Sequence, residues 1–172
     1  MTRIRLFALA LLSLGFTACL DATNPQYNTV ENTSFDSSLG VNLNSSTATD
    51  VGVYYRDITV GTGPTVSPGV ETYMYYQAYL STGVEFDSLR PPKIPVPITT
   101  GTQSLIPGFE IGLQGMKVGG RRQIIVPPNL AYGLNDYGTD QNGRVVIPGN
   151  SVLVFNVDLV NADGSPLITP AP

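Results

Sequence analysis

The feature that most limits the fold is the alternation of side chains between two faces of an extended chain in residues 70–80 and 151–160. In the first segment one face of an extended chain carries Met74, Tyr76, Ala78 and Leu80, and the other carries Tyr73, Tyr75, Gln77 and Tyr79. In the second segment one face carries Leu153, Phe155, Val157 and Leu159, and the other carries Val152, Val154, Asn156 and Asp158. A period of two predicts strands of an antiparallel sheet with its apolar face covered and its other face in water.

Four shorter segments are also typical of strands: residues 53–60, 84–88, 94–98 and 121–126. They are rich in β-branched and aromatic residues or are bounded by Gly and Pro turn signals. Pro95 and Pro97 lack the backbone N–H that a central strand donates, so the third segment is expected at a sheet edge.

One segment has a helical pattern instead. Pro107 suits a first helical position, and Ile106, Phe109 and Leu113 recur at spacings of three and four residues. Gly115 suits the end of this helix. A single short helix that covers the apolar face of an antiparallel sheet predicts a fold of the α+β class.

The composition excludes several kinds of chemistry. The chain of 172 residues has no His and one Cys, so it has no Ser-His-Asp triad, no imidazole metal ligand, no internal disulfide and no Cys-rich zinc site. A net charge of −4 argues against a nucleic-acid partner, which clustered Lys and Arg would bind. Asp136, Asp140 and Asn142 lack the bidentate Glu of a calcium loop, and Asn142-Gly143 is interpreted as a hairpin turn. We expect neither a metal nor a cofactor.

The first 18 residues have the pattern of a secretion signal. Arg3 and Arg5 precede an apolar run over 6–16 that is too short to span a bilayer comfortably, and small residues close it. Cys19 follows these small residues, which resembles a bacterial lipoprotein signal and implies a lipidated Cys19, export and anchoring to a membrane of the cell envelope. The alternative is an ordinary secretion signal with an incidental Cys.

Residues 20–50 are rich in Ser, Thr and Asn, with four acidic residues and no basic one. Their apolar residues follow neither the strand nor the helix period, which predicts a disordered tether over 19–50 and a folded domain over 51–172. The alternative is that Phe35, Leu39, Val41 and Leu43 dock on that domain.

Three groups of residues, taken in order, resemble motifs of the FKBP-type peptidyl-prolyl isomerases, a family that binds macrolide immunosuppressants. They are Tyr76 with residues 83–88 (GVEFDS), residues 105–110 (LIPGFE) with 115–122 (GMKVGGRR), and residues 127–133 (PPNLAYG) with Ile147, Pro148 and residues 153–155 (LVF). The resemblance covers most of residues 51–160. It implies a twisted antiparallel sheet half-wrapped around one short α-helix.

The resemblance also implies a pocket that binds proline. Its catalytic positions fall on Tyr76, Phe86, Asp87, Phe109, Tyr132 and Phe155. Its other substrate-binding positions fall on Val96, Leu105, Ile106 and Ile147. Phe109 would form the floor, and Tyr76, Phe86, Ile106 and Phe155 would form the walls. The Ile106 N–H and the Tyr132 hydroxyl would donate to substrate carbonyls, and Asp87 would orient Tyr76 or face the twisted carbonyl carbon.

This chain departs from the family pattern at several positions. Phe109 stands where many members have Trp, Val96 stands at a wall position that is often aromatic, and residues 133–146 are longer than in compact members. Each position also has a purely structural interpretation. The three phenylalanines could be core, Tyr132 could bond to backbone, and Asp87 could be a turn residue. Lys117, Arg121 and Arg122 are expected to be solvated charges.

Rotation about an X-Pro bond suits this set of residues. The barrier of ~20 kcal/mol reflects amide conjugation, and a twisted amide is less polar than a planar one. A dry apolar pocket therefore favours the twisted state without any ionising catalyst. We expect a monomeric prolyl isomerase of exported proteins, whose partners are proline-containing polypeptides and macrolide inhibitors. The alternatives are a non-catalytic chaperone or peptide-binding lipoprotein that uses the same pocket, and a lipoprotein that keeps only the fold.

Overall fold

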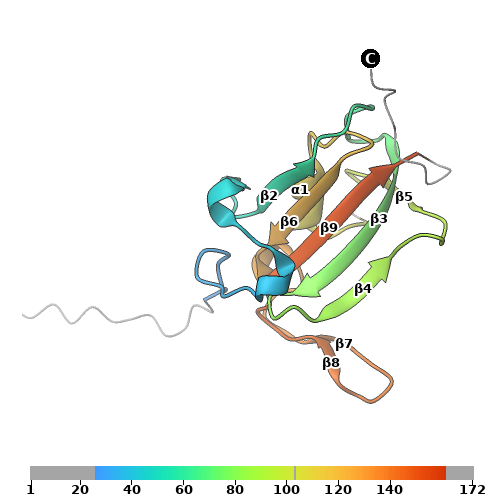
Figure 1. The fold of residues 1–172 in the computed structure, drawn as a ribbon. Helices are drawn as coiled ribbons and strands as arrows, with labels where there is room; N and C mark the ends of the chain where they lie inside the picture. Colours follow the sequence, from blue (N-terminus) through green and yellow to red (C-terminus); the bar gives the residue numbers. More distant parts are fainter. Residues whose placement is uncertain (1–25, 103, 162–172) are drawn as a thin grey trace, which may run out of the picture.

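The computed structural model describes residues 26–102 and 104–161, which form a seven-stranded antiparallel sheet with a short helix on one face and a separate two-stranded hairpin (Figure 1). The strands are β1 (Thr47–Ala48), β2 (Tyr54–Thr59), β3 (Glu71–Leu80), β4 (Glu85–Leu89), β5 (Val96–Thr99), β6 (Arg121–Val126), β7 (Tyr137–Thr139), β8 (Val145–Ile147) and β9 (Leu153–Val160). The helix is α1 (Pro107–Leu113), and the 3-10 turns are η1 (Ser37–Leu39), η2 (Leu43–Ser45) and η3 (Pro128–Leu130). The predicted fold class and the predicted strands and helix are confirmed, with boundaries that shift by one or two residues.

The main sheet has the strand order β1-β2-β6-β9-β3-β4, and β5 pairs with β3 beside β4. β3 and β9 pair over eight residues, with Tyr76 opposite Val157 and Ala78 opposite Phe155. Their predicted apolar faces are buried together over α1, with Met74, Ala78, Leu153, Phe155, Val157 and Leu159 in one cluster. The alternation seen in the sequence therefore sets which side chains form the core. The turn at Asn142-Gly143 joins β7 and β8 as a separate hairpin.

Two glycines bring α1 into direct contact with β6. A Cβ atom on Gly108 would lie 2.3 Å from Val126 Cγ1, and one on Gly112 would lie 2.2 Å from Ile124 Cγ2. Residues four apart share one face of a helix, so these glycines allow the helix backbone to lie on the β-branched side chains of the sheet. Phe109 and Leu113 are thereby buried against the strands.

On the opposite face of the sheet, residues that were predicted to form a disordered tether pack against the strands. Val30 and Leu39, which are 1% and 7% exposed, are buried in a cluster on that face with Ile125, Val152 and Val154. Phe35, Val41 and Leu43 pack against the same cluster. We call residues 26–45 the N-terminal strap (Figure 1, in blue and cyan). Within residues 26–50 the disordered-spacer prediction is wrong and the docking alternative is correct. Residues 1–25, with Cys19, lie outside the described part of the chain.

The same contacts correct the prediction of a fully wet outer face. Val152 and Val154 were assigned to that face and are 2% and 0% exposed, because the strap covers them. The strap is built from 3-10 turns and irregular backbone, so its buried residues have no regular period in the sequence.

The prediction that Arg122 is a solvated charge is wrong, because its side chain is buried and only 3% exposed. Its Nε and Nη2 donate to the two carboxylate oxygens of Asp57 at 2.7 and 2.9 Å. Its Nη1 donates to the carbonyls of Gly112 and Gln114 at the end of α1, and its guanidinium lies 4.4 Å from the centre of the Tyr55 ring. The buried charge is therefore paired and ties the end of the helix to β2. Lys117 is exposed and Arg121 is partly exposed.

Leu39→Ala should lower the free energy of unfolding by about 2–3 kcal/mol, because it removes a buried side chain from the cluster beneath the strap. Urea unfolding of the full chain measures this change. Asn44→Ala, at an exposed position in the same strap, is the matched control and should change the value by less than about 0.5 kcal/mol. Equal stability of Leu39→Ala and the wild type would contradict the docking of the strap.

Candidate functional site

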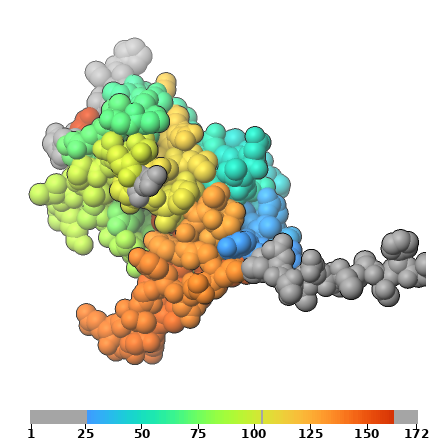
Figure 2. All heavy atoms as spheres, turned by 180° about the vertical axis from the view of Figure 1, so that it is seen from behind, coloured from blue at the N-terminus to red at the C-terminus, as the bar shows by residue number. Residues whose placement is uncertain are grey.

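A hollow of about 1150 Å³ opens between the strands and the start of α1. It is lined by eight of the ten residues predicted from the family resemblance: Tyr76, Asp87, Val96, Leu105, Ile106, Phe109, Tyr132 and Phe155. They come from β3, β4, β5, β9, α1 and the segments before α1 and after η3. Figure 2 shows this side of the molecule, with the β7–β8 hairpin projecting from it. Residues far apart in the sequence therefore meet at one site.

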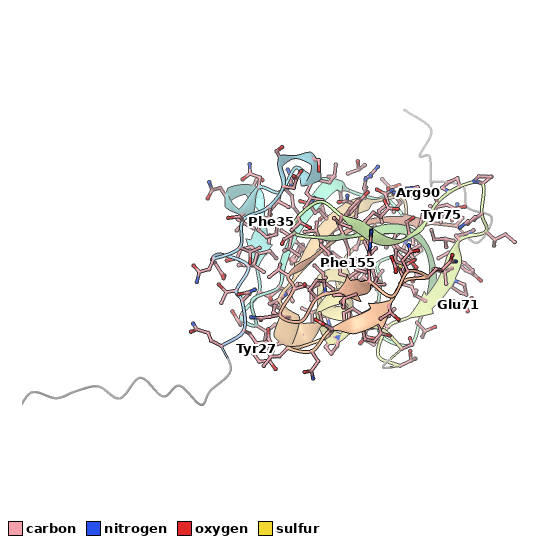
Figure 3. All side chains as sticks on the ribbon, turned by 90° about the horizontal axis from the view of Figure 1, so that it is seen from below. Tyr27, Phe35, Glu71, Tyr75, Arg90 and Phe155 are labelled. Atoms are coloured by element: carbon pink, nitrogen blue, oxygen red, sulfur yellow. The ribbon has the colours of Figure 1, made fainter. Side chains whose placement is uncertain are left out.

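Two aromatic rings form the deepest part of the hollow. Phe109 and Phe155 are 4% and 8% exposed, and their ring centres lie 4.9 Å apart at an interplanar angle of 55°. Figure 3 shows Phe155 in the interior of the molecule, away from Tyr27 and Phe35 of the strap. Both rings are held by neighbouring elements of the core, so this surface of the hollow is apolar and packed.

Phe86 and Ile147 are the two predicted residues that do not line the hollow. The ring of Phe86, which is partly exposed, meets that of Phe155 edge to face, with the centres 6.3 Å apart. Ile147 is 3% exposed and lies within the core cluster. The predictions that these two side chains contact the substrate stay predictions.

Tyr76 and Asp87 form the main polar contact of the hollow. The Tyr76 hydroxyl donates to Asp87 Oδ2 at 2.8 Å. Burial raises the pKa of Tyr76 to about 12, with further contributions from its hydrogen bond to Asp87 and from the charge of that carboxylate. Burial also raises the pKa of Tyr132, to which Tyr137 and Asp87 add. Both phenols therefore stay protonated as hydrogen-bond donors at neutral pH.

Two donors at the hollow are left available for a ligand. Neither the Tyr132 hydroxyl nor the Ile106 N–H has an acceptor among the described residues. Ile106 precedes α1, where the first N–H groups of a helix have no partner within the helix. Within the described residues the hollow thus combines an apolar floor with two donors that have no acceptor, an arrangement that binds an apolar group flanked by carbonyls. No cluster of three metal-ligating side chains is found within the described residues.

Tyr137 is a lining residue that the sequence analysis missed. It lies at the start of β7 and stacks on Tyr132, with ring centres 4.2 Å apart and an angle of 27°. The signal in the sequence was the extra length of residues 133–146, but an aromatic residue near a hairpin does not by itself reveal which ring it contacts. Leu89, Ile94 and Pro97 complete the open side of the hollow.

A model of the family described as FKBP-type peptidyl-prolyl cis-trans isomerase matches residues 63–160. The chain belongs to this family. The resemblance found in the sequence is thereby confirmed for the FKBP-type domain. The model match ends at the last residue of β9 and includes every lining residue of the hollow.

Similar proteins agree with this assignment. The chain is 40% identical over 106 residues to an FK506-binding protein of Streptomyces anulatus, covering 61% of this chain and 82% of that protein. It is 33% identical over 109 residues to one of Neisseria meningitidis serogroup B, covering 63% of this chain and 94% of that protein. A 46 kDa FK506-binding nuclear protein of Spodoptera frugiperda is 38% identical over 112 residues, which are 64% of this chain and 25% of that protein. The matched part of this chain covers only about a quarter of the length of several larger relatives.

Solved structures share the fold. The crystal structure of FkpA from Escherichia coli has a TM-score of 0.57 and 30% identity, with 71% of this chain and 53% of that chain covered. The crystal structure of AtFKBP13 has a TM-score of 0.59 and 29% identity, with 70% of this chain and 98% of that chain covered.

The raised pKa of Tyr76 predicts a pH dependence of stability. Its pKa is about 12 when folded and near 10 when unfolded, so the unfolded chain loses this proton first. The contribution of Tyr76 to stability is complete below pH 10 and is lost as the pH rises toward about 12. Urea unfolding at several pH values in this range should show a steeper loss for the wild type than for Tyr76→Phe. Parallel curves for the two proteins would contradict the assignment.

Proposed function

We propose that this protein catalyses cis-trans rotation about X-Pro peptide bonds by binding the proline ring over Phe109. The observation that carries the proposal is the buried pair of Phe109 and Phe155 in a hollow with two donors that have no acceptor among the described residues. Membership of the FKBP-type family supports the same reaction.

The reaction requires a change of surroundings rather than a transfer of protons. The planar amide is stabilised by conjugation, which also separates charge between nitrogen and oxygen and creates a barrier of ~20 kcal/mol. Rotation out of the plane removes this charge separation. Water solvates the polar planar state better than the twisted state, whereas an apolar pocket lacks this preference. Moving the bond from water to the hollow therefore lowers the barrier.

Each lining group has a role in this scheme. Phe109 supports the proline ring, and Tyr76, Ile106 and Phe155 enclose it. The Tyr132 hydroxyl and the Ile106 N–H donate to carbonyls of the client chain and hold one side of the bond while the other turns. The hydrogen bond between Tyr76 and Asp87 favours the orienting role for Asp87, because the carboxylate fixes the phenol of the wall. Val96 and Leu105 line the hollow and would contact client residues that flank the proline.

The clients are proline-containing polypeptides, and macrolides of the FK506 type are expected inhibitors. Several relatives are named FK506-binding proteins, and a hollow of about 1150 Å³ is ample for a ligand larger than a proline ring.

We also propose export and anchoring through a lipidated Cys19. The support is the charged start, short apolar run and small residues before the only Cys of the chain. No helix among the described residues is long and apolar enough to cross a membrane. The clients would then be exported proteins at the cell envelope.

Phe109→Ala should lower kcat/KM for a short proline peptide at least tenfold, which corresponds to about 1.4 kcal/mol of barrier. The cis-trans exchange rate measured by NMR or in a protease-coupled assay tests this. Met116→Ala, which removes a buried core side chain that does not line the hollow, is the control for general destabilisation and should retain the wild-type rate.

Because Phe109 is also a core residue, Tyr132→Phe provides a second test that removes one hydroxyl only. Its kcat/KM should fall about three- to tenfold. Peptide binding by the wild type without any acceleration of exchange would contradict catalysis and select the non-catalytic peptide-binding alternative. Wild-type rates in both variants would contradict the pocket assignment.

Lipidation of Cys19 predicts a mature chain that begins at this residue and carries acyl chains. The intact mass of the protein extracted from membranes should show them, and Cys19→Ser should abolish both the added mass and membrane retention. A mature chain with an unmodified thiol at residue 19 would contradict the anchor while leaving the isomerase proposal intact.

A further inference from the structure

The loop before β9 contains an unusual backbone conformation at Asn150. Its φ is 61°, and it is the one described residue other than glycine with a positive φ. This region costs free energy for residues with a side chain, although Asn tolerates it better than most. Such a conformation persists when the contacts around it hold it in place.

The contacts of Asn150 explain why Asn rather than Gly occupies this position. Its side-chain Oδ1 accepts from the backbone N–H of Asn28 at 2.8 Å, and its carbonyl accepts from Asn28 Nδ2 at 2.7 Å. Its Nδ2 donates to the carbonyl of Gln26 at 3.4 Å. We call the paired contacts of these two asparagines the Asn28/Asn150 clasp. It joins the N-terminal strap to a loop more than 120 residues away in the sequence.

The clasp leads directly to the wall of the hollow. The N–H of Asn150 donates to the carbonyl of Gly133 at 2.8 Å, and Gly133 follows Tyr132 in the chain. A second tie lies beside it, where the Gly149 N–H donates to Asp136 Oδ1 at 2.8 Å, next to Tyr137. The backbone segments at Leu134 and at Gly149 are so close that a Cβ on Gly149 would lie 1.9 Å from the carbonyl oxygen of Leu134.

The strap provides a fixed support for the clasp. Val30, two residues after Asn28, is 1% exposed in the outer cluster. The carboxylate of the next residue, Glu31, accepts from the Tyr54 hydroxyl of β2 at 2.6 Å. The strap is thus bound to the sheet on one side and to the loop of Tyr132 on the other.

The outer part of the hairpin offers no buried surface to Tyr137. Residues 137–145 are exposed and project from the body of the molecule (Figure 2, in orange). The Tyr137 ring stacks on Tyr132, its backbone pairs with that of Ile147, and further ties lie at residues 133–136 and 147–150.

We propose that the N-terminal strap is a positioning element of the hollow, and that the Asn28/Asn150 clasp holds Tyr132 and Tyr137 in place to receive a client. Asn28 and Asn150 are positioning residues, since they touch the loop and not the hollow. The proposal rests on the proposed isomerase function for its effect on turnover, but its structural part can be tested without turnover.

The test compares four full-length chains: wild type, Asn28→Ala, Asn150→Gly and Asn32→Ala. Asn28→Ala removes the donor to the Asn150 carbonyl. Asn150→Gly adopts a positive φ without strain but removes the side chain of the clasp, so it separates clasp contacts from backbone conformation. Asn32→Ala changes an exposed Asn of the same strap and is the matched control.

Two readouts are measured for each chain. The first is the nuclear Overhauser contact between the rings of Tyr132 and Tyr137, which reports their stack directly. The second is the split of peptide turnover into kcat and KM. Asn28→Ala and Asn150→Gly should weaken the ring contact and raise KM about three- to tenfold with a smaller change in kcat, because a misplaced donor weakens substrate and transition state alike. Asn32→Ala should match the wild type in both.

An unchanged ring contact and unchanged KM in Asn28→Ala and Asn150→Gly would overturn the proposal. So would equal losses in Asn32→Ala, which would show a general effect of the strap rather than of the clasp. If the wild type shows no turnover, the isomerase proposal fails, and the ring contact alone then decides whether the clasp positions the two tyrosines.

Discussion

The close contact of α1 with the sheet is the constraint on which the hollow depends. Gly108 and Gly112 present no side chain to β6, so the helix backbone lies against Val126 and Ile124. This approach buries Phe109 against Phe155 and leaves the start of the helix, with the Ile106 N–H, at the edge of the hollow. A larger residue at either glycine would push the helix outward and with it the floor of the site. The buried Arg122 secures the other end of the helix by binding its last carbonyls.

Much of this arrangement was predictable from the sequence because it is local. The period of two in β3 and β9 fixes their inner faces, and Pro107 with the spacing of Phe109 and Leu113 fixes α1. The errors concern contacts between distant segments. Arg122 has an ordinary position after a glycine turn, and only its pairing with Asp57 and the helix carbonyls makes it a buried residue. The strap has no periodicity because irregular backbone presents its apolar residues to the outer face.

The candidate site likewise has residues that the sequence predicted and residues that it did not. Motif order located eight lining residues, because the segments that carry them have a fixed place in this fold. It does not separate lining residues from their neighbours: Phe86 contacts Phe155 and Ile147 is buried in the core cluster, and neither lines the hollow. It also missed Tyr137, whose ring reaches Tyr132 only through the path of the hairpin.

The docked strap also changes how an anchored enzyme would work. A free tether from Cys19 to residue 50 could extend about 100 Å, whereas the seven residues from Cys19 to Gln26 could extend only about 25 Å. An anchor at Cys19 would therefore hold Gln26, at the start of the docked strap, within about 25 Å of the membrane surface.

The central claim is that an apolar hollow accelerates prolyl rotation with no proton transfer in the rate-limiting step. The comparison of kcat/KM in H2O and D2O tests it most directly. The account predicts equal rates in the two solvents, since no exchangeable proton moves as the bond turns. A clearly slower reaction in D2O would show that a proton is transferred and would contradict the account.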